Sequence, residues 1–172
     1  MKLRSSTAHT FDLRTVGYEF SDLEPVPDRF DANWLTIEVK ITDLNGASFT
    51  FRDSCLLTWD VKALASWFDR IARGENTEAA LTFMEPILLF VFDRAGSPAV
   101  VRVAMNKQID TAIEALPSFG DAWLLIPGQS KREWPCLEFP VDPDQFRQAG
   151  ESLNRQLLTY PERAITEQLG RA

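Results

Sequence analysis

The sequence predicts one α+β domain: a mostly antiparallel β-sheet of about six to eight strands with two main amphipathic helices packed on it. Apolar and polar residues alternate through much of the first half of the chain, which is typical of half-buried strands. Apolar residues recur every three or four positions near the middle and near the C-terminus, which indicates helices. A chain of 172 residues fits a single domain. We therefore expect one domain over residues 1–172, with residues 1–9 and 164–172 as loose tails.

The first predicted strand begins near Phe11 and changes phase along its length. Phe11 and Leu13 share one parity, whereas Tyr18 and Phe20 share the other. One extra residue reverses the side to which the following side chains point, so we expect a β-bulge near residues 15–17. The next segment, EFSDLEPVPDRFDAN, contains two prolines, which predict irregular structure.

A hairpin is predicted where the strand NWLTIEVKIT is followed by DLNGASFTF. A two-residue Asn-Gly loop would set apolar residues of one strand opposite polar residues of the other, although paired residues share a face. A three-residue loop over residues 44–46 instead pairs Ile41 with Phe49, and Val39 with Phe51. We therefore expect a type I turn with Gly46 in the left-handed conformation, forming a G1 bulge.

Both helices have predictable ends. The first has Thr58 as its expected N-cap and Gly74 just past its C-terminus. The second has Asp142 as N-cap, with Gln145 completing a capping box, and Pro161 ends it. The expected buried stripes are Val61, Leu64, Ala65, Phe68, Ile71 and Ala72 in the first helix, and Phe146, Ala149, Leu153, Leu157 and Tyr160 in the second.

Further strands are predicted between the helices. The segment LTFMEPILLFVFDRAGSPAVVRVAM predicts two or three strands, with a break near Glu85 and a turn over residues 94–97. A short helical piece is expected over residues 109–116 and a strand over residues 122–126. The run IPGQSKREWP predicts a loop, and CLEF a short strand before the second helix.

Composition and motif content narrow the function. Lys and Arg number 18 against 25 Asp and Glu, so the net charge of −7 argues against nucleic-acid binding and favours a basic partner. The glycines form no phosphate-binding loop, and the single histidine, His9, lies in the expected N-terminal tail. The start MKLRSSTAHTFDL lacks the apolar stretch of a signal peptide, and no run is long enough to span a bilayer. We expect a cytoplasmic protein with free cysteines, no membrane contact, no metal and no cofactor.

Cys55 is the strongest candidate for a nucleophile, because it stands just before the first helix, whose N-terminus would lower the pKa of a thiol. Its apolar neighbours in CLL and its distance in sequence from His9 favour a buried, inert thiol instead. Trp59 and Trp67 lie eight residues apart near one helix face and fit the edge of a core better than a ligand platform. The sequence thus predicts no catalytic residues and a protein that is not an enzyme.

Four segments, taken together, resemble the WapI-type immunity proteins: ANWLTIEVKI, FRDSCLLTWDVKALASWFDRIARGE, LTFMEPILLFVF and LEFPVDPDQFRQAGESLNRQLLTYPER. The resemblance spans about residues 11–163. It implies a small bacterial protein that protects a cell against the toxin of a wall-associated, contact-dependent competition system. It implies no inhibitory residue at any particular position.

The acidic segment over residues 19–31 is the candidate partner-binding surface, and with this resemblance its expected partner is a basic protein toxin. It has five carboxylates against Arg29, and its two prolines limit the entropy lost on docking. A merely solvated acidic loop is the alternative at this site. For the whole protein, an orphan small-ligand-binding domain and an enzyme using Cys55 remain as alternatives. The candidate partner-binding residues are Glu19, Asp22, Glu24, Asp28 and Asp31.

Overall fold

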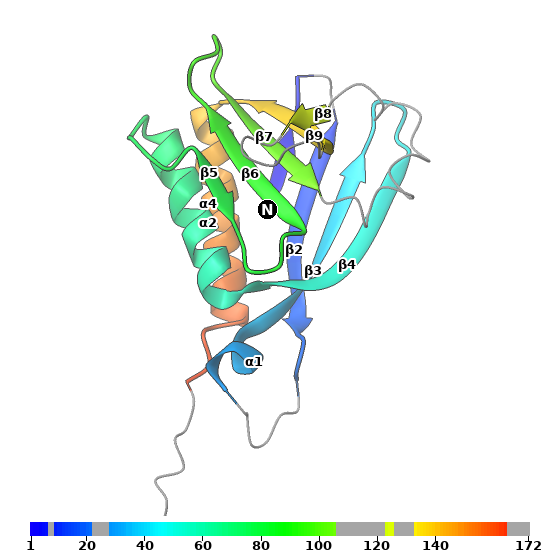
Figure 1. Ribbon diagram of the computed structural model, residues 1–172, viewed down its shortest axis with the longest axis vertical. Coiled ribbons are helices and arrows are strands. Elements are labelled where there is room, and N and C mark those ends of the chain that lie inside the picture. The colour runs from blue at the N-terminus through cyan, green and yellow to red at the C-terminus, as the bar shows by residue number, and fades with distance from the viewer. Residues whose placement is uncertain (7–8, 22–27, 106–122, 126–132, 165–172) are drawn as a thin grey trace, which may run out of the picture.

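The computed structural model describes the whole chain except residues 7–8, 22–27, 106–122, 126–132 and 165–172. The expected helical piece over residues 109–116 and all but Ala164 of the expected loose tail over residues 164–172 lie outside the described residues. The described elements form two antiparallel sheets and two long helices (Figure 1). This arrangement confirms the predicted α+β class.

The first sheet has the strand order β1-β2-β3-β4. Its strands are β1 (Lys2–Arg4), β2 (Thr10–Tyr18), β3 (Trp34–Thr42) and β4 (Ser48–Leu57). Phe11 lies opposite Ile41, which lies opposite Phe49, so the apolar residues of three strands share the face that turns to the core. The register between β2 and β3 shifts between Thr15 and Gly17, which confirms the predicted bulge.

The β3–β4 hairpin has the predicted register, because Ile41 pairs with Phe49. Gly46 has a φ of 82°, as the predicted left-handed position requires. Asp43 holds the turn through its Oδ1, which accepts hydrogen bonds at 2.8 Å from the backbone N–H groups of Asn45 and Ala47. Face matching and turn chemistry therefore select the same three-residue loop.

The second sheet has the strand order β5-β6-β7-β9-β8. Its strands are β5 (Ala80–Thr82), β6 (Leu88–Asp93), β7 (Val100–Met105), β8 (Trp123–Leu125) and β9 (Glu133–Pro140). The break near Glu85 and the strand expected over residues 122–126 are confirmed. The predicted loop IPGQSKREWP is wrong at its end, because Glu133 to Pro135 pair with β8 and extend β9 backwards. These three residues are in a strand and not in a loop because β8 supplies partners for their backbone hydrogen bonds.

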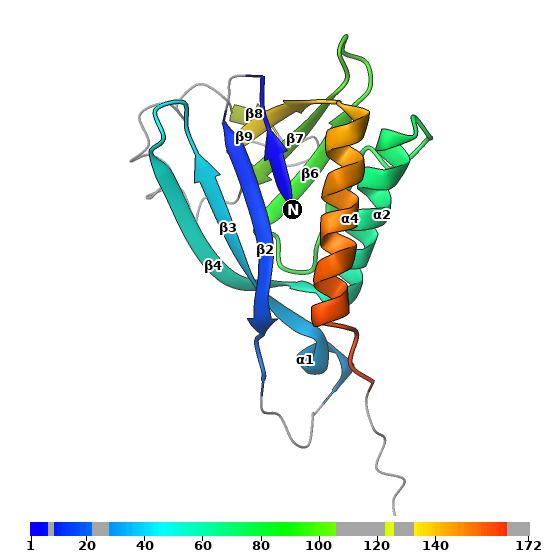
Figure 2. The same ribbon diagram turned by 180° about the vertical axis from the view of Figure 1, so that it is seen from behind.

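The two long helices, α2 (Thr58–Ala72) and α4 (Pro143–Thr159), pack side by side along one edge of the core (Figures 1 and 2). Every residue of the predicted α2 stripe is buried, and the α4 stripe is buried or packed against the core. The helices approach closely at Gly150, where a Cβ atom would lie 2.9 Å from the carbonyl oxygen of Ala65. Gly150 therefore sets the separation of the pair.

The C-terminus of α2 is closed as predicted. Gly74 has a φ of 68°, and its N–H donates to the carbonyl of Ile71 at 2.9 Å. The N–H of Glu75 donates to the carbonyl of Arg70 at 3.0 Å. These two bonds form a Schellman motif, which satisfies carbonyls that the helix leaves unpaired.

The predicted N-cap of α2 is wrong by one residue. Leu57 occupies the cap position, and its N–H donates to the Asp60 carboxylate at 2.9 Å. Thr58 is buried inside the first turn, where its hydroxyl donates to Oδ1 of Asn33 at 3.1 Å. A tertiary partner therefore takes the side chain that the sequence assigned to capping.

The capping of α4 agrees with the prediction at Asp142 but not at Gln145. The Asp142 carboxylate accepts hydrogen bonds from the N–H groups of Asp144 and Gln145. The Gln145 side chain, however, accepts a hydrogen bond at 2.8 Å from the backbone N–H of Arg4. Because β1 is an edge strand, its outer N–H groups need partners, and Gln145 supplies one.

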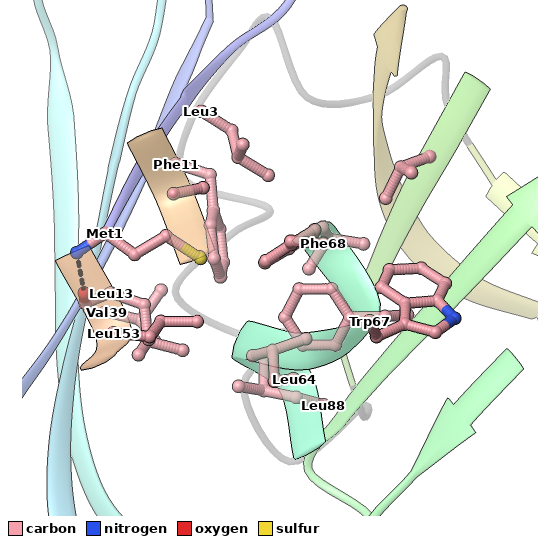
Figure 3. Packing of buried hydrophobic residues seen from close by; sticks show 14 of the residues in the cluster. Met1, Leu3, Phe11, Leu13, Val39, Leu64, Trp67, Phe68, Leu88 and Leu153 are labelled. Atoms are coloured by element: carbon pink, nitrogen blue, oxygen red, sulfur yellow. Dashed lines mark hydrogen bonds between the residues drawn. The ribbon is translucent and has the colours of Figure 1, made fainter. Parts of the chain in front are cut away.

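The N-terminal residues belong to the core, which corrects the expectation of a loose tail over residues 1–9. Leu3 is fully buried, and Met1 points into the core while its ammonium group donates to the carbonyl of Leu13 at 2.6 Å (Figure 3). His9 is also buried, where the sequence placed it in a mobile tail. Pairing between β1 and β2 supplies the backbone hydrogen bonds that order this segment.

Candidate partner-binding site

Cys55 is a buried core residue at the end of β4, with 1% of its surface exposed. Loss of water on burial, together with the nearby negative charges of Asp53, Glu85 and Asp60, raises the pKa of its thiol to about 12. Burial likewise raises the pKa of the Cys136 thiol, to about 11. These surroundings disfavour a thiolate, so the structure gives the nucleophile alternative no support.

The space between the sheets and the helices is filled by aromatic side chains. Phe11 makes edge-on contacts with Phe90 and Phe139, at centroid distances of 6.2 and 6.4 Å. Phe68 contacts Phe90 and Phe146 at 5.9 and 5.4 Å. A small ligand between sheet and helices would have to displace this packed core, so the structure does not favour the small-ligand alternative.

The two predicted edge tryptophans have different surroundings. Trp67 is 2% exposed and contacts Phe68, Phe90 and Phe92, while its Nε1–H donates to the carbonyl of Glu78 at 2.8 Å. This side chain is part of the core, as predicted. Trp59, by contrast, is half-buried in the first turn of α2, where Phe30 and Arg29 lie against its ring.

The predicted acidic segment is partly helical, which corrects the expectation of irregular structure throughout. Helix α1 (Arg29–Asn33) begins after Asp28, whose carboxylate accepts hydrogen bonds from the N–H groups of Phe30 and Asp31 at 2.7 and 2.9 Å. Asp31 lies in the first turn, where a negative charge is favourable. The two prolines precede the helix, so they do not prevent it.

The five candidate residues therefore have different roles. Glu19 is exposed just after β2, and its N–H donates to the carbonyl of Trp34 at 2.9 Å. Asp28 is exposed and caps α1, and Asp31 is half-buried. Asp22 and Glu24 lie outside the described residues.

Two carboxylates from other elements join this group. Partial desolvation raises the pKa of Glu19, and the negative charges of Asp31, Asp53 and Glu85 raise it further. We call these four carboxylates the acidic end. They come from the end of β2, α1, β4 and the β5–β6 connection, and Figure 1 shows α1 below the lower ends of β2 and β4, with the β5–β6 connection above it. The acidic end is thus assembled from segments that are far apart in the sequence.

Sequence reasoning missed Asp53 and Glu85, although β4 contains a signal for the first of them. Phe49, Phe51 and Asp53 have the same parity, and Asp53 pairs with the buried Ile37 of β3. A carboxylate at a position of core parity indicates that the core opens there. For Glu85 the sequence gives no comparable signal, because only the path of the β5–β6 connection brings it near.

Exposed apolar side chains flank the acidic end. Phe30 precedes Asp31 and is 44% exposed, and Met84 precedes Glu85 and is 58% exposed. The Phe30 ring lies edge-on to Trp59 at 5.6 Å, which holds it in place. Large apolar side chains next to charges are typical of protein-binding surfaces.

The C-terminal segment fixes both stems of the acidic segment. The Nδ2 of Asn33 donates to the carbonyl oxygens of Arg29 and Arg163 at 2.9 and 3.0 Å, and its Oδ1 accepts from the N–H of Arg163 at 2.8 Å. The Arg163 guanidinium donates to the carbonyl of Phe20 at 2.8 Å and lies 3.5 Å from the centre of the Tyr18 ring. We call this arrangement the Asn33 clamp, and it ties the end of β2 to α1.

The described part of the chain contains neither a metal-binding cluster nor a membrane-spanning helix. Among those residues, no group of three or more His, Cys, Asp and Glu side chains is arranged to hold a metal ion. No helix there is both long enough and apolar enough to cross a membrane.

Comparison with known proteins supplies one match. The chain matches the Immunity protein WapI-like family over residues 2–161. Comparison with curated proteins and with solved structures gave no match. The matched range includes both sheets, both long helices and all five candidate residues.

Proposed function

Because the chain belongs to the Immunity protein WapI-like family, we propose that it neutralises the toxin of a contact-dependent bacterial competition system by binding to it. The observation that carries this proposal is the family match over residues 2–161 of 172. Membership of an immunity-protein family implies a toxin partner and suggests that the protein acts by binding and not by catalysis. The burial of Cys55 supports a non-catalytic mechanism.

The acidic end is the proposed toxin-binding surface, together with Asp22, Glu24 and Asp28 of the acidic segment. The net charge of −7 and the crowding of carboxylates around Glu19 support a basic partner surface. A field of this sign would accelerate encounter with a basic toxin at low salt. Phe30 and Met84 would then supply apolar contact once the charges have oriented the two proteins.

The Asn33 clamp supports this surface by preorganisation. It fixes α1 relative to β2 before any partner arrives. A surface that is already ordered loses less conformational entropy on binding. The cytoplasm is the proposed site of action, and the two free cysteines are consistent with a reducing compartment.

The test is co-expression with a cognate toxin domain, sought in the neighbouring genes, followed by binding kinetics with the purified pair. The expected result is rescue of growth and a salt-dependent association rate. A four-site variant, with Glu19→Gln, Asp31→Asn, Asp53→Asn and Glu85→Gln, should associate roughly tenfold more slowly at low salt. Asp28 is kept in this variant because it caps α1.

A matched control removes the same number of charges elsewhere: Asp69→Asn, Glu75→Gln, Asp144→Asn and Glu151→Gln. If both variants slow association equally, net charge alone acts and the acidic end is not the interface. If the unchanged protein neither rescues growth nor binds the toxin, the proposed function itself is wrong.

A further inference from the structure

A row of charges crosses the outer face of the first sheet, the side turned away from the core. Arg14, Glu38 and Arg52 lie directly opposite one another on β2, β3 and β4. Glu38 alternates with the buried Ile37 and Val39, so it points outward. Figure 2 shows these three strands with α4 to one side of them.

The Glu38 carboxylate positions both arginines. The Nε of Arg14 donates to Oε1 at 2.7 Å, and the Nε of Arg52 donates to Oε2 at 2.7 Å. The Glu38 side chain is only 7% exposed, whereas those of Arg14 and Arg52 are 62% and 64% exposed. Each guanidinium has five N–H donors, so each keeps donors that can reach a partner. The carboxylate is therefore covered, and two oriented guanidiniums are presented to solvent.

Lys40 adds a third exposed cation in the next row, opposite Asp12 and Thr50. Thr36 and Ser54 lie on the other side of the arginine row, with their hydroxyl oxygens 2.9 Å apart. Thus the exposed charges of this sheet face are mainly cationic, with the half-buried Asp12 as the counter-charge opposite Lys40, although the chain as a whole has a charge of −7. We call Arg14, Lys40 and Arg52 the cationic face.

We infer that the cationic face is a second interaction surface, which binds an acidic segment of a protein partner. Guanidinium groups pair with carboxylates through two parallel hydrogen bonds, and a shared buried carboxylate holds both groups ready for this. Three cations on a negatively charged protein are too few to track a phosphate backbone, which favours a carboxylate-bearing partner over a nucleic acid. The cationic face has the opposite charge to the acidic end and would bind a different kind of partner. The inference therefore does not depend on the proposed function.

The experiment is an NMR titration at low salt with two synthetic peptides, one bearing eight glutamates spaced by glycines and one with glutamine in their place. The expected result is a shift of the Nε–H signals of Arg14 and Arg52 with the glutamate peptide only. Lys40→Glu should weaken binding at least about threefold, because it replaces one attraction by one repulsion. This variant leaves both Glu38 ion pairs intact, so the protein should fold normally.

Lys62→Glu, on the exposed side of α2, is the matched control and should leave the affinity unchanged. Equal shifts at Arg147 and Arg155 of α4 would show non-specific charge attraction and overturn the inference. Tighter binding of a ten-nucleotide single-stranded DNA at the same residues would also overturn it, in favour of a nucleic-acid surface. None of these outcomes depends on toxin binding, so each is distinct from failure of the proposed function.

Discussion

The Asn33 clamp can be tested by Asn33→Ala, which removes one fully buried side chain from the junction of three segments. The substitution deletes both amide donors, leaving the carbonyl oxygens of Arg29 and Arg163 without them. It also deletes the acceptor of the Arg163 N–H and the Thr58 hydroxyl. We expect α1 and the C-terminal segment to separate from each other in the variant.

The size of the effect follows from these four hydrogen bonds, whose lengths are 2.8 to 3.1 Å. A hydrogen bond contributes about 0.5–1.5 kcal/mol, and a buried partner left unpaired adds to the loss. Water can reach some of the released groups, because most of these bonds are only partly buried. We therefore expect the free energy of unfolding to fall by about 2–4 kcal/mol.

Urea unfolding followed by tryptophan fluorescence measures this loss, and hydrogen exchange locates it. The amide proton of Arg163 should lose protection well before the amides of α2 do. Asn154→Ala, at an exposed position of α4, is the control and should change stability by less than about 0.7 kcal/mol, in the stabilising direction. A loss below about 0.5 kcal/mol for Asn33→Ala, or unchanged protection at Arg163, would refute the clamp.

Three further predictions concern the helix pair, the charged row and the thiols. Gly150→Ala should reduce the free energy of unfolding by about 1–2 kcal/mol, because the added Cβ would meet the Ala65 carbonyl at 2.9 Å and this outweighs the gain in helix propensity; a more stable variant would show that the helices separate freely. Hydrogen bonds from Arg52 and Arg14 lower the pKa of Glu38, so its stabilising effect should be complete above about pH 5 and fade as the pH falls through the lowered pKa. The difference in stability between the unchanged protein and Glu38→Gln should therefore shrink on acidification, and a constant difference down to pH 2 would contradict this. At pH 8 a pKa of about 12 leaves roughly one Cys55 thiol in ten thousand ionised, so a thiol reagent should label it only after unfolding; rapid labelling in the folded state, faster than at Cys136, would restore the nucleophile hypothesis.

The two charged surfaces have different physical origins. The acidic end collects carboxylates from several segments, and partial desolvation together with their repulsion raises the pKa of Glu19. The cationic face comes from one cross-strand row, in which the two arginines lower the pKa of Glu38. Crowded like charges favour a partner of opposite sign, whereas an ionised carboxylate that is paired with two arginines orients both of them. Separate variants of the two surfaces can therefore distinguish their partners.

The sequence by itself determined the features that depend on neighbouring residues. The three-residue hairpin loop, the bulge at residues 15–17 and the Schellman end of α2 follow from periodicity and turn chemistry within about ten residues. The helix stripes also follow, because an amphipathic helix can bury only its apolar side. The family was indicated by segments of this kind, and the match over residues 2–161 confirmed it.

Tertiary structure alone decided the features that join distant parts of the chain. Asn33 and Arg163 are 130 residues apart, and no local pattern marks either as a partner of the other. The N-terminal segment became a strand because β2 supplies its hydrogen bonds, and Gln145 covers its edge from α4. Glu85 joins the acidic end only through the path of the β5–β6 connection. Periodicity records which side of a segment is apolar, but it does not record which distant segment will cover that side, so the composition of both surfaces depended on the fold.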